Sequence, residues 1–193
     1  MNIAIIDYGA GNIKNVQFAV KRLGYEAVLT NNEDFIRTAD KVIFPGVGEA
    51  SSAMNKLLDT GLDKVIPTLT QPVLGICLGM QLMCKHTEEG NTKGLGIFDV
   101  EVFKFKGEEK VPQIGWNQIE ALEGALFKAI KEKEFMYLVH SYYAPLCKET
   151  IAKTFYGDWY STALHKNNFY GVQFHPEKSS TAGEAILNNF LKI

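Results

Sequence analysis

The chain has 193 residues, of which 46% are hydrophobic and 22% charged, and its formal net charge is −2. This length and balance predict one compact domain over residues 1–193, and the small net charge gives no reason to expect nucleic acid or a membrane surface as a partner. The apolar N-terminal run ends at Asp7, too early for a signal segment or a bilayer span, and the three cysteines, Cys77, Cys84 and Cys147, suggest neither a disulfide framework nor a metal site. We therefore expect a cytoplasmic protein without a metal or other cofactor.

Strands separated by helices are predicted in the first half of the chain. Apolar residues at helical spacing follow the turn Gly9-Ala10-Gly11-Asn12, and another helical segment contains Met54, Leu57 and Leu58. The strands are expected at Ile3–Asp7, Glu26–Thr30, Lys41–Pro45 and Pro72–Cys77. This alternation indicates an α/β fold with a parallel, doubly wound sheet.

The second half of the chain is predicted to be richer in strands, as at the edge of a mixed sheet. Its strands are expected at Gly96–Lys106, Val111–Ile119, Phe135–His140, Ile151–Tyr156 and Phe169–Phe174. A helix closes the chain, and the pair Thr181 and Glu184 has the spacing of a capping box at the start of that helix.

The segment Gly75-Ile76-Cys77-Leu78-Gly79 indicates a nucleophilic cysteine. It follows an apolar strand and has the G-x-C-x-G form of a nucleophile elbow, whose glycines leave room for a sharp reversal of the chain. The turn would place the Cys77 sulfur at a helix N-terminus, which favours the thiolate. A buried structural cysteine would explain Cys77 taken alone. However, Gln81 lies one helical turn further on the same face, and its amide can pair with the amide of a glutamine substrate.

A base and the acid that orients it are predicted in His175-Pro176-Glu177. A cysteine hydrolase needs both groups, and in the extended chain that Pro176 favours, residues two apart project to the same side. An ordinary loop histidine would explain this tripeptide alone, but it is less probable beside the elbow. His140 is the rival base; because it has no carboxylate close in sequence, it is interpreted as a residue that lines the pocket.

Two backbone N–H groups are candidates for an oxyanion hole, which acyl transfer requires. The first is that of Leu78, directly after the nucleophile. The second belongs to Val47 in Pro45-Gly46-Val47-Gly48, where the flanking glycines would let the peptide plane rotate, although an ordinary turn at a strand end has the same sequence character. Such a donor would be switchable. The early Gly9-Ala10-Gly11 segment lacks the third glycine of a dinucleotide fingerprint, because Lys14 occupies that position.

Together these motifs resemble those of the class I glutamine amidotransferases. Within that superfamily the chain is similar to the glutaminase subunit of imidazole glycerol phosphate synthase, a histidine-pathway enzyme, and the similarity covers essentially the whole chain. The shorter motifs that carry this finer resemblance are Ile6-Asp7-Tyr8-Gly9-Ala10-Gly11-Asn12, Pro112-Gln113-Ile114-Gly115-Trp116-Asn117, Val139-His140-Ser141-Tyr142-Tyr143 and Asn168–Glu177.

The resemblance implies a flavodoxin-like three-layer sandwich with a mostly parallel central sheet. It implies hydrolysis of L-glutamine to glutamate and ammonia through a Cys77 thioester, with Gly48, Gln81, Glu89, Ser141 and Tyr142 binding the substrate. It also implies a heterodimer with a (β/α)₈-barrel cyclase, which uses the ammonia to convert phosphoribulosyl-formimino carboxamide nucleotide (PRFAR) into imidazole glycerol phosphate and AICAR. Asn12, Trp116 and Lys178 would face this partner.

Two kinds of alternative remain from the sequence. The chain is compatible with the glutaminase of another synthase, of the anthranilate or aminodeoxychorismate type or of a surface-sugar amidation pathway, although the first two types usually have histidine where this chain has Met80. It is also compatible with a non-catalytic binding module in which Cys77 senses redox state. That reading does not require Gln81, His175 and Glu177 together, whereas catalysis does.

Overall fold

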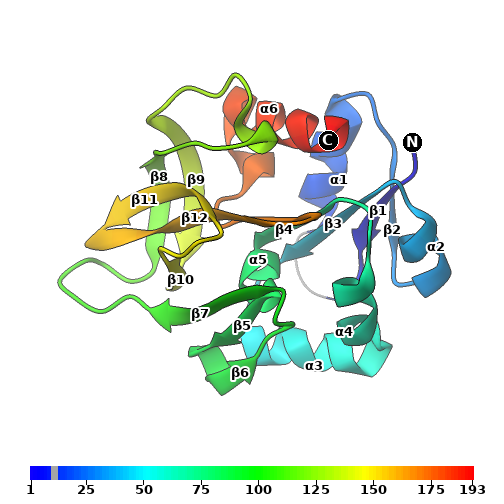
Figure 1. Ribbon diagram of the computed structural model, residues 1–193, viewed down its shortest axis with the longest axis horizontal. Helices are drawn as coiled ribbons and strands as arrows, with labels where there is room; N and C mark the ends of the chain where they lie inside the picture. The colour runs from blue at the N-terminus through cyan, green and yellow to red at the C-terminus, as the bar shows by residue number, and fades with distance from the viewer. Residues whose placement is uncertain (10–12) are drawn as a thin grey trace.

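The computed structural model describes residues 1–9 and 13–193, and Asn12 lies outside the described residues. Its principal sheet has the strand order β2-β1-β3-β4-β13-β12-β10-β7-β5-β6, with β11 paired to β12, and a separate two-stranded ribbon is formed by β8 and β9 (Figure 1). The strands are β1 (Ile3–Ile6), β2 (Ala27–Thr30), β3 (Lys41–Gly46), β4 (Val73–Cys77), β5 (Cys84–Thr87), β6 (Thr92–Lys93), β7 (Phe98–Lys104), β8 (Gln113–Ile119), β9 (Glu134–His140), β10 (Tyr142–Pro145), β11 (Thr150–Tyr156), β12 (Asp158–Lys166) and β13 (Phe169–Val172). The α-helices are α1 (Ile13–Arg22), α2 (Glu33–Thr38), α3 (Ala50–Thr60), α4 (Leu62–Val65), α5 (Leu78–Met83) and α6 (Ser180–Lys192).

The sheet is buried between two layers, as the α/β prediction requires. Ile3 and Ile5 of β1 belong to a buried cluster that includes α1, α6 and residues of the β8–β9 ribbon, whereas Ala4 and Ile6 belong to a second cluster that includes α3, α4 and α5. Figure 1 shows α1 and α6 on one side of the sheet and α3, α4 and α5 on the other. The predicted three-layer α/β sandwich is therefore confirmed. None of the helices in the described ranges combines the length and the apolar character that a bilayer crossing requires.

The sheet has a parallel part and a mainly antiparallel extension. Strands β2, β1, β3, β4 and β13 run parallel to their neighbours, and β13 then pairs antiparallel with β12. Because the parallel strands point the same way, the chain leaves β3, β4 and β13 at the same edge of the sheet, which is where ligands bind in open α/β sheets.

Two expectations for the second half of the chain need correction. The strands around Val111–Ile119 and Phe135–His140 do not extend the edge of the main sheet, because they pair with each other along their whole length. The long strand β12 was not predicted. Its buried part includes Ser161 and Thr162, whose polar side chains remove the alternation by which a strand is recognised, and Thr162 instead hydrogen-bonds to Thr154 across the strand pair.

The capping box predicted for the last helix is also wrong. Helix α6 begins at Ser180, so Thr181 lies inside its first turn, and the preceding Ser179 makes no side-chain cap. The Glu184 carboxylate instead accepts a hydrogen bond from Arg22 of α1 at 2.6 Å. This surface ion pair joins the two helices that cover one face of the sheet.

Candidate active site

A cavity of about 310 Å³ opens where β3, β4 and β13 end. It is reached by segments far apart in the sequence, including the loop after β3, the elbow after β4, the end of β9 and the segment after β13. Its lining is formed by Val47, Gly48, Cys77, Leu78, Gln81, Glu89, Pro112, Val139, His140, Ser141, Tyr142 and His175. The fold thus brings the predicted nucleophile, base, oxyanion donors and substrate-binding residues to one site.

Cys77 is the last residue of β4 and directly precedes α5, and it has the strained backbone conformation of a nucleophile elbow. Its φ is 53° and its ψ is −110°, a combination that a residue with a side chain rarely adopts. The flanking glycines allow close packing. A Cβ on Gly79 would lie 1.9 Å from the Phe44 carbonyl oxygen of β3, and one on Gly75 would lie 2.9 Å from the Met80 nitrogen. The elbow therefore requires glycine because the helix start is pressed against neighbouring backbone.

His175 and Glu177 form a buried pair, with the two side chains 2% and 4% exposed. Since an ionised carboxylate only accepts, the His175 Nδ1–H donates to Glu177 Oε1 at 2.8 Å. Nε2 is buried and has no hydrogen-bond partner within the described ranges. Burial alone would lower the pKa of His175, but the nearby Cys77 sulfur, together with the hydrogen bond and charge of Glu177, raises it to about 10. The fold thus places an imidazole of raised pKa, oriented by a carboxylate, beside the predicted nucleophile.

The backbone around His175 is fixed by strand β9 and by Ser179. The His175 N–H donates to the Tyr137 carbonyl at 2.9 Å. The Ser179 hydroxyl accepts from the Tyr137 N–H at 2.9 Å and donates to the His175 carbonyl at 2.7 Å. The Ser179 side chain is therefore committed to positioning His175, which explains why it does not cap α6.

His140, the rival base, lies in the wall of the cavity. Its Nδ1 lies 2.7 Å from the Tyr142 carbonyl and its Nε2 lies 3.2 Å from the Tyr160 hydroxyl, so both ring nitrogens are engaged within the protein. Burial, and to a smaller extent the charge of His175, lower the pKa of His140 to about 4, although the hydrogen bond to the Tyr142 carbonyl raises it. No described carboxylate contacts its ring, and it stays neutral at physiological pH.

The remaining predicted residues divide between the cavity and the outer surface. The Glu89 carboxylate accepts from the Ala50 N–H at 2.9 Å, and burial followed by the charge of Glu49 raises the pKa of Glu89. Trp116 and Lys178 do not line the cavity. Both lie near the Tyr137 ring, whose centroid is 6.1 Å from that of Trp116 and 5.8 Å from Lys178 Nζ.

Comparison with known proteins identifies the family. The model of the family described as "Glutamine amidotransferase class-I" matches residues 4–193. The chain is 56% identical to the Imidazole glycerol phosphate synthase subunit HisH of Bacteroides fragilis and 45% identical to the protein of that name from Pectobacterium atrosepticum, in both cases over 100% of each protein. The chain belongs to the class I glutamine amidotransferase family. A solved structure described as a glutamine amidotransferase has the same fold, with a TM-score of 0.77 at 17% identity over 98% of this chain and 97% of that chain.

The two candidate oxyanion donors of this amidotransferase lie on different kinds of segment, one at the start of a helix and one in a glycine-rich turn. Leu78 begins α5 directly after the nucleophile. In the Pro45-Gly46-Val47-Gly48 turn, Gly46 is confined, because a Cβ there would lie 2.7 Å from the Gly79 nitrogen and 2.8 Å from the Tyr8 hydroxyl, which itself donates to the Pro45 carbonyl at 3.1 Å. Gly48 has a φ of +100° and open space around its Cα, and Val47 is 37% exposed. Close packing therefore accounts for glycine at position 46 and the positive φ accounts for glycine at position 48, while rotation of the Val47 peptide stays a prediction.

The amidotransferase site also contains a residue that the sequence interpretation missed. Gln173 is fully buried, and its Nε2 donates to the Cys77 sulfur at 3.6 Å. One signal for it was present: Gln173 is the polar residue in the apolar run Phe169–Phe174, and it lies two positions before His175. In an extended chain this spacing places both side chains on one side. Among the described residues, no group of three His, Cys, Asp or Glu side chains is arranged to hold a metal ion.

Proposed function

We propose that this chain, acting in the cytoplasm as one domain over residues 1–193, is the glutaminase subunit of an imidazole glycerol phosphate synthase. Cys77 is the nucleophile that hydrolyses L-glutamine to glutamate and ammonia. The observation that carries this proposal is the buried His175–Glu177 pair beside the sulfur at the elbow, because a thiol needs a positioned base to become an effective nucleophile.

The positions of these groups support the following reaction. The Cys77 proton passes to His175 Nε2, and the thiolate attacks the substrate carboxamide carbon. The N–H groups of Leu78 and Val47 stabilise the oxyanion of the tetrahedral intermediate, and His175 then gives its proton to the departing ammonia. Water, deprotonated by His175, attacks the resulting thioester and releases glutamate. Glu177 keeps the imidazole oriented throughout.

The rest of the cavity suits the polar groups of glutamine. Both Gln81 Nε2 hydrogens have protein acceptors, the Tyr142 carbonyl and Gln173 Oε1, each at 2.9 Å. Gln81 is therefore left with only its side-chain oxygen to offer the substrate, as a hydrogen-bond acceptor. The sequence predicted that its amide would both donate and accept. Glu89 supplies a carboxylate for the substrate's ammonium group. Gly48, Ser141 and Tyr142 complete the binding site by lining the same cavity.

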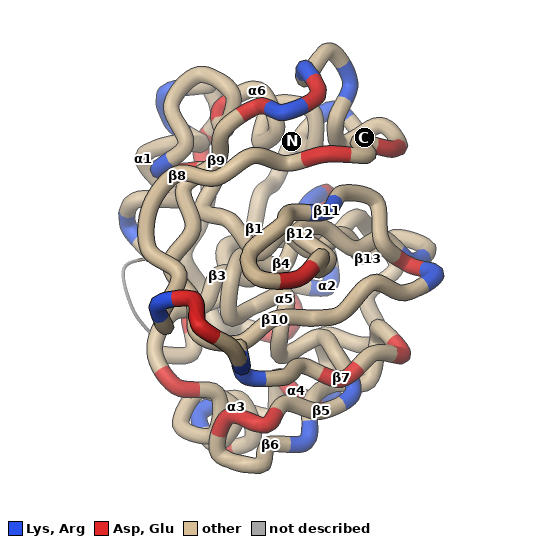
Figure 2. Tube along the Cα trace, turned by 90° about the vertical axis from the view of Figure 1, so that its left-hand side faces the viewer, with Lys and Arg blue, Asp and Glu red and all other residues tan. Residues whose placement is uncertain are grey.

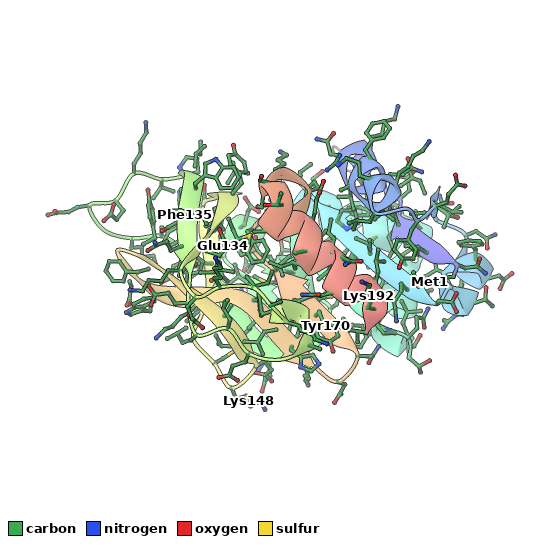
Figure 3. All side chains as sticks on the ribbon, turned by 90° about the horizontal axis from the view of Figure 1, so that it is seen from above. Met1, Glu134, Phe135, Lys148, Tyr170 and Lys192 are labelled. Atoms are coloured by element: carbon green, nitrogen blue, oxygen red, sulfur yellow. The ribbon has the colours of Figure 1, made fainter. Side chains whose placement is uncertain are left out.

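The outer face of the β8–β9 ribbon is proposed as the surface that binds the partner, a (β/α)₈-barrel cyclase. Register places Trp116 opposite Tyr137 on this face, and Ile114, Trp116 and Phe135 are 63%, 52% and 48% exposed. Strand β8 carries no charged residue, as its uniform colour in Figure 2 shows, and Figure 3 labels Phe135 on the ribbon beside α6. Large aromatic side chains with little charge are typical of the centre of protein interfaces.

This partner consumes the ammonia that the glutaminase releases. The cyclase combines the ammonia with PRFAR to form imidazole glycerol phosphate and AICAR in L-histidine biosynthesis, and Lys178 faces this partner together with Trp116. The relatives that match over their full length carry the name of a subunit of this synthase, which supports an assembly of two chains.

The catalytic proposal is tested with Cys77→Ala in the complex with the cyclase of the same organism. We expect no detectable glutamate release, normal folding by circular dichroism, and no covalent labelling by a glutamine-analogue diazoketone. Cys147→Ala is the matched control, because Cys147 is half-buried and lies outside the cavity lining. Glutamate release by Cys77→Ala at the rate of the unmodified enzyme would refute the proposed nucleophile.

The interface proposal is tested with Trp116→Ala. We expect the affinity for the cyclase, measured by titration calorimetry, to fall by at least tenfold, since exposed tryptophans are typical binding hot spots. Leu58→Ala is the control, because Leu58 is 55% exposed but lies on α3 in the opposite layer. Equal affinities for the two variants would place the partner elsewhere.

A further inference from the structure

Two buried side-chain amides, those of Gln81 and Gln173, form a series of hydrogen bonds that ends at the Cys77 sulfur. Gln81 Nε2 donates to the Tyr142 carbonyl and to Gln173 Oε1, each at 2.9 Å, and Gln173 Nε2 donates to the Cys77 sulfur at 3.6 Å. Gln81 is 4% exposed and Gln173 is fully buried. Buried side-chain amides are costly unless they are hydrogen-bonded, so their arrangement here is constrained.

The direction of this chain follows from its first acceptor. A backbone carbonyl only accepts hydrogen bonds, so the Gln81 atom that faces the Tyr142 carbonyl must be the NH₂ group. The same NH₂ group faces Gln173, which therefore presents its oxygen to Gln81. Only the NH₂ group of Gln173 remains for the sulfur. Both amide orientations are thereby set by one main-chain carbonyl, and the atom facing Cys77 is an obligatory donor.

We propose that Gln173 is a further catalytic residue, whose Nε2–H holds the Cys77 sulfur in its thiolate form and stabilises it again as a leaving group. The inference rests on the proposed role of Cys77 as nucleophile. When the thiol ionises, its proton goes to His175 Nε2 and the new negative charge on sulfur accepts from Gln173. When the thioester is hydrolysed, the carbon–sulfur bond breaks with its electron pair on sulfur, and the same N–H receives that charge. A donor that meets a charged atom forms a stronger bond than one that meets a neutral atom.

The other titratable groups near the sulfur come from separate elements. His175 lies after β13, Tyr8 after β1 and Tyr160 on β12, and His140 on β9 lies in the same cavity wall. A substitution at Gln173 changes none of these residues. Its effect on the titration of Cys77 therefore reports the loss of the N–H donor.

The test measures the rate of Cys77 alkylation by iodoacetamide as a function of pH, in the full chain with Cys84→Ala and Cys147→Ala as background. Gln173→Leu keeps approximate size but removes the donor, and we expect the alkylation midpoint to rise by about one pH unit, which is roughly tenfold less thiolate below the midpoint. The deficit in glutaminase kcat should shrink as pH rises, which a general loss of structure would not produce. Gln173→Glu keeps the acceptor for Gln81 and places a carboxylate against sulfur, so its midpoint should rise further.

Gln113→Leu is the matched control, because Gln113 is 3% exposed and accepts from the Tyr160 hydroxyl without contacting the sulfur. Its alkylation midpoint should stay at the value of the background protein. An unchanged midpoint in both Gln173 variants would overturn the inference even if Cys77→Ala abolished glutaminase activity. Retained activity in Cys77→Ala would instead refute the proposed function itself, so the two failures are distinguishable.

Discussion

Replacing Gly79 with alanine should strongly destabilise this domain. The added Cβ would lie 1.9 Å from the Phe44 carbonyl oxygen and 3.0 Å from the Phe44 carbonyl carbon, and both atoms belong to the backbone of β3. Reaching even 3.0 Å from that oxygen requires a shift of about 1 Å between α5 and β3, which the close packing of a protein interior resists. We expect a loss of roughly 3–5 kcal/mol, at the upper end of what overpacking produces.

Urea unfolding followed by far-ultraviolet circular dichroism measures this loss. Gly24→Ala is the matched control, since Gly24 has a φ of +87° with nothing within 4 Å of its added Cβ, and backbone strain alone should cost about 1 kcal/mol there. If Gly79→Ala unfolded at the same urea concentration as Gly24→Ala, close approach would not be the reason for glycine at the elbow.

Four further outcomes follow from the structure. Cys77→Ala should lower the pKa of His175 from about 10, because the sulfur helps to raise it, and NMR titration of the imidazole measures this. In the unmodified protein the raised pKa of His175 contributes its full stabilisation below pH 6.5, and this contribution is lost as the pH rises through about 10. Urea unfolding midpoints measured between these pH values should therefore fall, and a constant midpoint would contradict the prediction. Glu149→Gln should raise the unfolding free energy by roughly 1 kcal/mol. The Glu149 carboxylate is 5% exposed, has no hydrogen-bond partner among the described residues, and has only the peripheral Lys148 ammonium at 3.6 Å (Figure 3). A lower thermal unfolding midpoint in the variant would show that the charge of Glu149 is compensated. Tyr8→Phe should lower the unfolding free energy, measured by urea unfolding, by about 1 kcal/mol, because the Pro45 carbonyl loses its hydrogen-bond donor. An unchanged unfolding free energy would mean that the carbonyl has another donor.

The parallel half of the sheet was predictable because its strands are short apolar runs separated by helical periodicity. The elbow and the His175-Pro176-Glu177 segment were recognisable for a similar reason, since their spacing is local. Strand β12 was hidden because Ser161 and Thr162 place polar side chains at buried positions, where they hydrogen-bond to Thr150 and Thr154 of the neighbouring strand β11. Gln173 was missed as a site residue because its role depends on Gln81, 92 positions away. Contacts of this kind become visible only once the chain is folded.

Strand β9 contacts two parts of the molecule. Its aromatic side chains lie on the outer face of the ribbon, while its peptide groups at Tyr137 hydrogen-bond to the segment that carries the His175 imidazole. A protein bound to the ribbon would therefore be linked to the base through one main-chain hydrogen bond and the short, buried Ser179 side chain. The thickness of a single strand separates the proposed docking face from the proposed base.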